Sequence, residues 1–167
     1  MAEPLVVVMG VSGCGKTTVG RALASLTGWP FLDADTLHSS ENVAKMAAGT
    51  PLSDADRWPW LGQVADWIAA RVAAGEPGIV ACSALKRAYR DRLREADPDL
   101  RLAYLSIDPD TLRERLAHRV GHFFPQRLLN AQLMDFEHPA ADEHPIIVPS
   151  GQSPEGQAET ILAALQR

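Results

Sequence analysis

The sequence contains few cysteines, no long apolar run and no excess of positive charge. Cys14 lies in a glycine-rich segment and Cys82 at the end of an apolar run, so we expect no structural disulfide and a reducing, cytoplasmic compartment. The apolar runs are too short to span a bilayer. The net charge of −5 disfavours a nucleic-acid partner, because such proteins present basic surfaces.

The length and pattern of the chain indicate one domain over residues 1–167. A chain of 167 residues can build a substantial core, and it contains no repeat or low-complexity linker that would divide it. An apolar run begins at Leu5, so we expect no signal peptide. Short apolar runs alternate with helical patterns, which predicts an α/β fold with five parallel strands between two helical layers. We expect these strands at residues 5–9, 29–35, 78–82, 100–107 and 146–148.

The segment Gly10–Thr17 reads Gly-x-x-x-x-Gly-Lys-Thr, the pattern of a phosphate-binding P-loop. It follows the predicted strand 5–9 and precedes residues 18–26, whose apolar spacing predicts a helix that ends at Gly28. The first N–H groups of such a helix lack backbone partners and can bind phosphate. The expected nucleotide-binding residues of this segment are Gly10, Val11, Ser12, Gly13, Cys14, Gly15, Lys16, Thr17 and Thr18.

Four side chains are candidates for the reacting centre. Lys16 is expected to reach the β- and γ-phosphates, and Thr17 to offer its hydroxyl to Mg²⁺. Asp33 and Asp35 end the predicted second strand and, being two residues apart, are expected to share a face. Ligands bind beyond the carboxyl ends of parallel strands, so we expect both acids beside the P-loop. The alternative is that they form a turn or cap a helix.

Two segments offer candidates for binding an anionic substrate. His38 lies near the start of a helix predicted over residues 37–48 and could contact a substrate or bond locally. Arg57 stands where a polar segment meets a helix that runs to about residue 74, and guanidinium suits carboxylate recognition. The alternative for Arg57 is an ion pair with Asp54 or Asp56.

Further basic residues follow later strands. Lys86, Arg87 and Arg90 fall in the first turns of a helix predicted over residues 84–94, where an anionic ligand could reach them. A second basic helix, which carries Arg115 and Arg119, leads into a glycine-bounded loop, as expected of a lid that closes over phosphates. We expect this lid at about residues 117–135. His118 and His122 have the spacing of a metal pair, but no acidic ligands accompany them, so zinc is not expected.

Several stretches together resemble the thermoresistant-type bacterial gluconokinases. They are the P-loop, residues 31–35 with His38, and residues 51–61, 81–91 and 121–125, and the likeness covers nearly the whole chain. The resemblance implies a P-loop kinase of the nucleoside-monophosphate and shikimate kinase type with a mobile lid. It also implies a cytosolic homodimer that phosphorylates D-gluconate on its 6-hydroxyl with ATP and Mg²⁺.

The resemblance and the chemistry of phosphoryl transfer imply roles for the candidates. Asp35 would accept or orient the proton of the attacking hydroxyl, while Thr17 and Asp33 would lie on the magnesium side, although which aspartate takes which role is left open. Arg115 and Arg119 would close over ATP. The expected catalytic residues are Lys16, Asp35 and Arg119. The expected substrate contacts are Asp35, His38, Arg57, Lys86, Arg87, Arg90, His122 and Gln132.

One stretch departs from the family pattern. Residues 131–137 read Ala-Gln-Leu-Met-Asp-Phe-Glu, where the family has Ser or Thr-Gln-Phe-x-Thr-Leu-Glu, so Gln132 and Glu137 are retained. The P-loop alone also fits a kinase for shikimate or a nucleotide, or a nucleotide-dependent switch without small-molecule turnover. The paired acids and the absence of a guanine-reading motif favour a catalyst over a switch.

Overall fold

The computed structural model describes residues 3–117 and 126–167. Within them, five parallel strands form one sheet in the order β2-β3-β1-β4-β5. The strands are β1 (Leu5–Met9), β2 (Phe31–Asp33), β3 (Gly78–Ala81), β4 (Arg101–Ser106) and β5 (Ile146–Pro149). Every residue of β1 is buried, as its apolar, β-branched sequence requires for a central strand covered on both faces.

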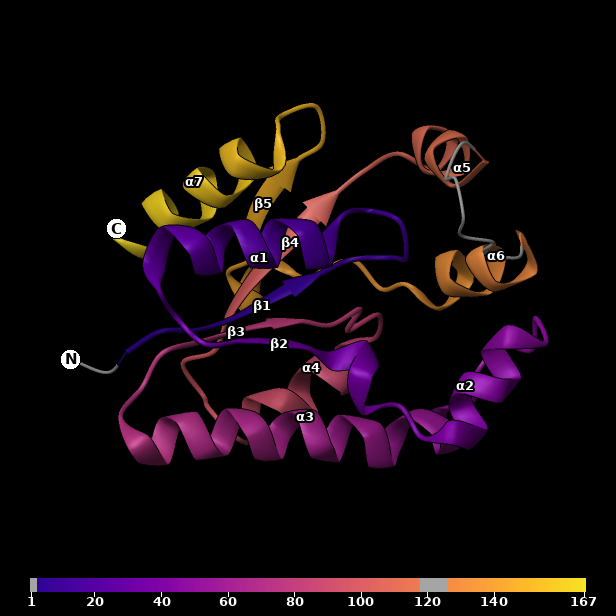
Figure 1. Ribbon diagram of the computed structural model, residues 1–167, viewed down its shortest axis with the longest axis horizontal. Helices are drawn as coiled ribbons and strands as arrows, with labels where there is room; N and C mark the ends of the chain where they lie inside the picture. Colours follow the sequence, from indigo (N-terminus) through magenta and orange to yellow (C-terminus); the bar gives the residue numbers. More distant parts are fainter. Residues whose placement is uncertain (1–2, 118–125) are drawn as a thin grey trace.

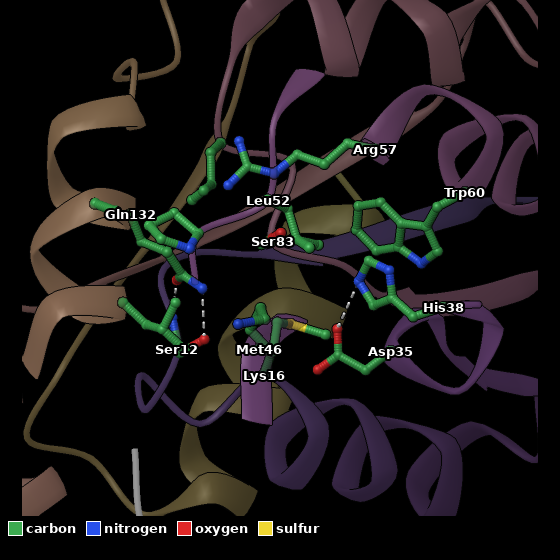
Figure 2. A pocket seen from close by; sticks show the side chains of 14 residues that line it. Ser12, Lys16, Asp35, His38, Met46, Leu52, Arg57, Trp60, Ser83 and Gln132 are labelled. Atoms are coloured by element: carbon green, nitrogen blue, oxygen red, sulfur yellow. Dashed lines mark hydrogen bonds and ion pairs between the residues drawn. The ribbon is translucent and has the colours of Figure 1, made fainter. Parts of the chain in front are cut away.

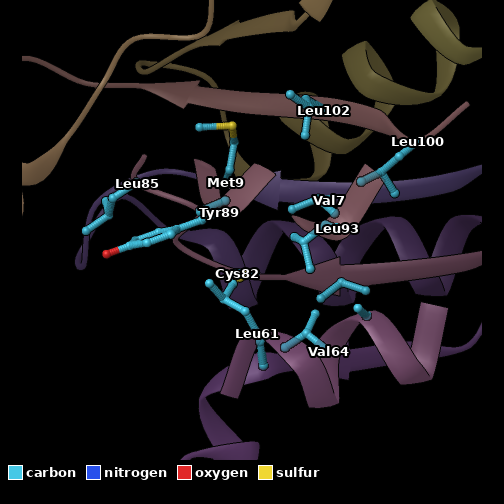
Figure 3. Packing of buried hydrophobic residues seen from close by; sticks show 14 of the residues in the cluster. Val7, Met9, Leu61, Val64, Cys82, Leu85, Tyr89, Leu93, Leu100 and Leu102 are labelled. Carbon is cyan, nitrogen blue, oxygen red and sulfur yellow. The ribbon is translucent and has the colours of Figure 1, made fainter. Parts of the chain in front are cut away.

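Helices cover both faces of this sheet (Figure 1). On one face lie α1 (Lys16–Thr27) and α7 (Pro154–Leu165), where Val6 and Val8 pack in one cluster with Leu23 and Ile161. On the other lie α3 (Asp54–Ala74) and α4 (Arg87–Arg94). Figure 3 shows the second cluster, in which Val7, Met9, Leu61, Val64, Tyr89 and Leu93 are packed together. The alternation of β1 side chains therefore builds two cores, and the predicted three-layer α/β/α fold is confirmed.

Four of the remaining helices gather beyond the carboxyl ends of the strands (Figure 1). They are the 3₁₀ helix η1 (Ala34–Leu37), α2 (Ser40–Ala47), α5 (Pro109–Ala117) and α6 (Gln126–Asp135). The 3₁₀ helix η2 (Ala141–Glu143) directly precedes β5 and lies near Arg101 at the start of β4. Central strand β1 leads directly into the P-loop, so this loop lies between the α5–α6 side and the α2 side.

Two predicted helices begin later than expected. The helix expected from residue 37 is divided into η1 and α2, because the Ser39 hydroxyl caps α2 by accepting a hydrogen bond from the Asn42 N–H at 3.1 Å. The helix expected from residue 84 begins at Arg87, because Ala84 adopts a left-handed φ of 45° that a helix cannot include. Among the helices of the described ranges, none has the length and apolar character that crossing a membrane requires.

Candidate active site

The P-loop shapes a cavity of about 430 Å³ at the start of α1. Gly13 and Gly15 have φ values of +86° and +99°, which L side chains rarely adopt, and Gly15 is the N-cap of α1. A Cβ on Gly13 would also lie 2.9 Å from the Leu116 side chain, so α5 packs closely on the loop. The wall of this cavity is formed by Ser12, Gly13, Gly15, Lys16, Thr17, Thr18, Asp35, Arg115 and Leu116.

Three of the expected nucleotide-binding residues hold the shape of the loop and do not line this cavity. The Gly10 N–H donates to the Ser83 carbonyl at 3.3 Å, and the Cys14 N–H donates to the Val11 carbonyl at 3.2 Å. The Val11 and Cys14 side chains are buried, and burial raises the pKa of the Cys14 thiol. Lys16 Nζ donates to the Val11 carbonyl at 3.2 Å.

A second cavity of about 160 Å³ adjoins the first (Figure 2). The two share Ser12, Lys16 and Asp35. Elements far apart in sequence supply the rest of its wall: Met46, Pro51, Leu52, Ser83, Leu85, Leu128 and Ala131, with His38, Arg57, Trp60 and Gln132. Among these, only His38, Arg57 and Gln132 were expected at the site from the sequence. Apolar residues such as Trp60 and Leu85 gave no such signal, because their spacing also fits an ordinary core.

Asp33 and Asp35 do not share a strand face, which corrects the expectation from the sequence. The strand ends at Asp33, whose carboxylate accepts the Asp35 N–H at 3.0 Å and so caps η1. Asp33 also accepts the Thr17 hydroxyl at 3.1 Å. The turn sends Asp35 to the wall between the two cavities, where its side chain is 71% exposed. The expected alternative, a helix-capping aspartate, is therefore correct for Asp33.

His38 is fixed against the wall of the second cavity. Its ring stacks on Trp60 with 4.2 Å between centroids, and the Trp60 Nε1–H donates to the Ala34 carbonyl at 2.7 Å. Burial lowers the pKa of His38, the Asp35 carboxylate opposes that effect, and Arg57 adds to it. His38 is therefore neutral near pH 7 and can exchange hydrogen bonds with a polyol hydroxyl.

Arg57 belongs to a buried polar network at the far side of this cavity. Its Nη1 donates to Tyr89 Oη at 3.0 Å and to Asp135 Oδ2 at 2.9 Å. Burial alone would lower the pKa of Arg57, but the bonds to Tyr89 and Asp135 outweigh it and raise the pKa. The Tyr89 hydroxyl in turn donates to Asp54. The expected alternative partners of Arg57 pair elsewhere: Asp54 with Lys86 and Asp56 with Lys45.

The three basic residues of the 86–90 region do not line the second cavity, so their expected role as substrate contacts stays a prediction. Lys86 Nζ lies 3.1 Å from Asp54, and Arg87 forms a two-pronged pair with Asp142 at 2.9 and 2.6 Å. Arg90 is fully buried and donates to Glu143 at 2.8 Å and to the Ala84 carbonyl at 2.8 Å. Because α4 begins three residues late, Arg87 and Arg90 face η2.

Helix α6 contacts the P-loop directly. Gln132 Oε1 accepts the Ser12 N–H at 2.8 Å, and Gln132 Nε2 donates to the Ser12 hydroxyl at 2.9 Å (Figure 2). The other retained residue, Glu137, accepts the Arg87 N–H at 2.9 Å and so binds the start of α4. Arg119 and His122, together with His118, lie outside the described residues, so their expected roles stay predictions.

The pair Thr17–Asp33 is the donor set in the described chain that suits a magnesium ion. A hydroxyl and a carboxylate provide the oxygen ligands that Mg²⁺ prefers, and this ion commonly takes its other ligands from phosphates and water. Within residues 3–117 and 126–167, no group of three or more His, Cys, Asp or Glu side chains could hold a metal ion alone. The residues thus fit a magnesium ion that arrives with a nucleotide.

Comparison with known proteins places this geometry in a family. An AAA domain model matches residues 5–139. A gluconokinase from Gluconobacter oxydans is 44% identical over 160 residues, which cover 96% of this chain and 90% of that protein. The chain belongs to the gluconokinase family. The thermoresistant gluconokinase of Escherichia coli is 40% identical, with 96% of this chain and 93% of that protein covered.

Solved structures agree with this family. The crystal structure of a gluconokinase from Sinorhizobium meliloti has a TM-score of 0.88 and 45% identity, and covers 98% of this chain and 92% of that one. A shikimate kinase from Acinetobacter baumannii has a TM-score of 0.59 at 19% identity over 98% of this chain and 93% of that one, which shows a shared fold alone. The resemblance drawn from the sequence is confirmed.

Proposed function

We propose that this chain transfers the γ-phosphoryl group of ATP to the 6-hydroxyl of D-gluconate, giving 6-phospho-D-gluconate. One observation carries the proposal: the P-loop cavity and the second cavity share Lys16, Asp35 and Ser12. A phosphate on one side of this wall and a hydroxyl on the other meet where a cation and a carboxylate are both present. Phosphoryl transfer requires this positioning more than it requires covalent chemistry by the protein.

The residues at and near the shared wall have different roles in the proposed phosphoryl transfer. Lys16 stabilises the negative charge of the β- and γ-phosphates, and Asp35 orients the attacking hydroxyl and accepts its proton. Thr17 and Asp33 would hold Mg²⁺, which supplies charge neutralisation at the phosphates when it is bound. Arg115, on α5 at the P-loop cavity, adds a second cation over the phosphates. Arg119 and His122 remain predicted lid and substrate contacts.

The second cavity suits a small polyhydroxy acid. Its volume of about 160 Å³ is below the roughly 300–1,000 Å³ of pockets for drug-sized ligands, which favours a sugar acid over a nucleotide acceptor. Arg57 supplies a cation for the carboxylate, while His38 and Gln132 offer hydrogen bonds to hydroxyls. The apolar wall formed by Trp60, Leu52 and Leu85 covers the carbon chain.

Cytoplasmic location and a homodimer are also proposals. They rest on the family resemblance and, for the compartment, on two cysteines that are both free and buried. A lid over about residues 117–135 is proposed on the position of α5 and α6 beyond the P-loop (Figure 1).

The test is ADP release by the purified chain with Mg-ATP and a panel of acceptors. The panel contains D-gluconate, shikimate, glycerate, AMP and no acceptor. Strong stimulation by gluconate alone is the expected result. Stimulation by a different acceptor would refute gluconate as the substrate but support a kinase activity. Tight ATP binding without any stimulation would favour a nucleotide-dependent switch.

A further inference from the structure

The Arg57 guanidinium, the group proposed to bind the substrate carboxylate, is already paired with a carboxylate of the protein. Asp135 Oδ2 lies 2.9 Å from Arg57 Nη1. Figure 2 shows the Arg57 guanidinium directed across the cavity toward the side that carries Gln132, which is on the same helix as Asp135. Resting on the proposed function, we infer that Asp135 is a specificity-determining residue that competes with the substrate carboxylate for Arg57.

Arg57 keeps its position without Asp135. Tyr89 Oη accepts from the same Nη1 at 3.0 Å, and Tyr89 is itself buried at 2% exposure and bonded to Asp54. The guanidinium also lies 5.7 Å from the centroid of the Tyr89 ring. These contacts come from α3 and α4, the layer packed on the sheet, so they fix the guanidinium independently of α6.

Asp135 is placed where it can move away from Arg57. It is the last residue of α6, and its side chain is 31% exposed, whereas that of Arg57 is 9% exposed. An incoming carboxylate therefore meets an arginine whose charge is balanced by a residue at a helix end. Two carboxylates beside one guanidinium repel each other, so binding of the acid requires Asp135 to withdraw.

The inference predicts which ligands a substitution at this position affects. Asp135→Asn keeps the size of the side chain and removes its charge, so the affinity for D-gluconate should rise by about tenfold, the order expected for a hydrogen bond to a charged group. D-Glucitol has the same hydroxylated chain without a carboxylate, so its affinity should stay within about twofold of the wild-type value.

The experiment is isothermal titration calorimetry of the full chain with D-gluconate and D-glucitol, together with KM for gluconate. The matched control is Asp142→Asn, which removes the carboxylate from another arginine pair, Arg87–Asp142, outside both cavities. Asp135→Ser is measured alongside, in case the amide variant does not fold. The control should leave both affinities unchanged.

The outcomes separate this inference from the proposed function. Gluconate affinity that is unchanged or weaker in both Asp135 variants would overturn the inference, because Asp135 would then be neutral or would position Arg57. An equal gain for gluconate and glucitol would also overturn it, since the effect would not depend on the carboxylate. A wild-type chain that neither binds nor phosphorylates gluconate would refute the proposed function instead.

Discussion

A substitution of Arg90 would distinguish a structural role from a substrate-binding role for the basic residues of α4. Its guanidinium is fully buried and donates to Glu143 and to the carbonyls of Ala84 and Leu85, between 2.8 and 3.3 Å. The Glu143 side chain is itself 1% exposed. Arg90→Met removes one partner of this buried pair and leaves a carboxylate and two carbonyls short of donors. Such a change destabilises a protein by about 3–5 kcal/mol.

The hydrogen bonds that Glu143 accepts also shift its pKa. Burial alone would raise this pKa, but hydrogen bonds from Arg90, the Ala140 N–H and Arg94 outweigh it and lower the pKa from 4.5 to about 2. A shift of this size corresponds to about 3 kcal/mol of stability near neutral pH. Because the folded pKa is depressed, this stability is complete above the unfolded pKa of 4.5 and is lost as the pH falls toward about 2.

Thermal unfolding at pH 7 measures the expected loss. At about 2–4 °C per kcal/mol for a chain of this size, Arg90→Met should lower Tm by about 10 °C. Arg92→Met is the matched control on the same helix, since Arg92 is part of a surface pair with Glu95, and its Tm should change little. Glu143→Gln should flatten the decline of stability between pH 5 and about pH 2, which acid unfolding followed by circular dichroism would record.

Enzyme kinetics test whether the role of Arg90 is structural. We expect KM for gluconate in Arg90→Met to match the wild type below its Tm, because Arg90 does not line the second cavity. A variant with an unchanged Tm and a large rise in KM would show that Arg90 faces the substrate. If Arg90→Met does not fold, Glu143→Gln carries the comparison.

Three further predictions test the site. Asp35→Asn should lower turnover by about 10²- to 10⁴-fold while calorimetry shows unchanged binding of an ATP analogue; near-normal turnover would remove Asp35 as the base. Arg57→Ala should weaken gluconate by more than about tenfold and ATP by less than about twofold, so equal losses in a binding titration would place Arg57 elsewhere. Burial raises the pKa of Cys14 and raises that of Cys82 to about 12, so peroxide at pH 7 should spare activity in the folded enzyme; rapid inactivation would contradict this.

The features predicted well from the sequence are those fixed by neighbouring residues. The apolar run 5–9 and the glycines of the P-loop each determine their own local conformation. The order of strands and helices then limits the chain to a parallel sheet with helices on both faces. The nucleotide site could be predicted at the carboxyl end of β1, because the P-loop motif lies between a predicted strand and a predicted helix.

The features predicted poorly depend on distant partners or on where a helix begins. Asp33 and Asp35 were placed on one face, but the strand ends at Asp33 because its own carboxylate caps the next turn. The burial of Arg90 could not be predicted, because its partner Glu143 lies 53 residues away and the helix begins at residue 87 and not at residue 84. Asp135 carried one signal, its departure from the family pattern, which did not reveal Arg57 as its partner.

The exposure of Asp35 has a consequence for how the reaction is controlled. Its side chain is 71% exposed in this arrangement, so water could occupy the position proposed for the sugar hydroxyl and be phosphorylated in its place. A productive complex must therefore cover Asp35 before transfer occurs. Helices α5 and α6 already reach this wall through Arg115 and Gln132, whereas the sheet beneath it is tightly packed. Closure of the α5–α6 side over the substrates would exclude that water, and displacement of Asp135 by the substrate carboxylate would make such a movement depend on the correct acceptor.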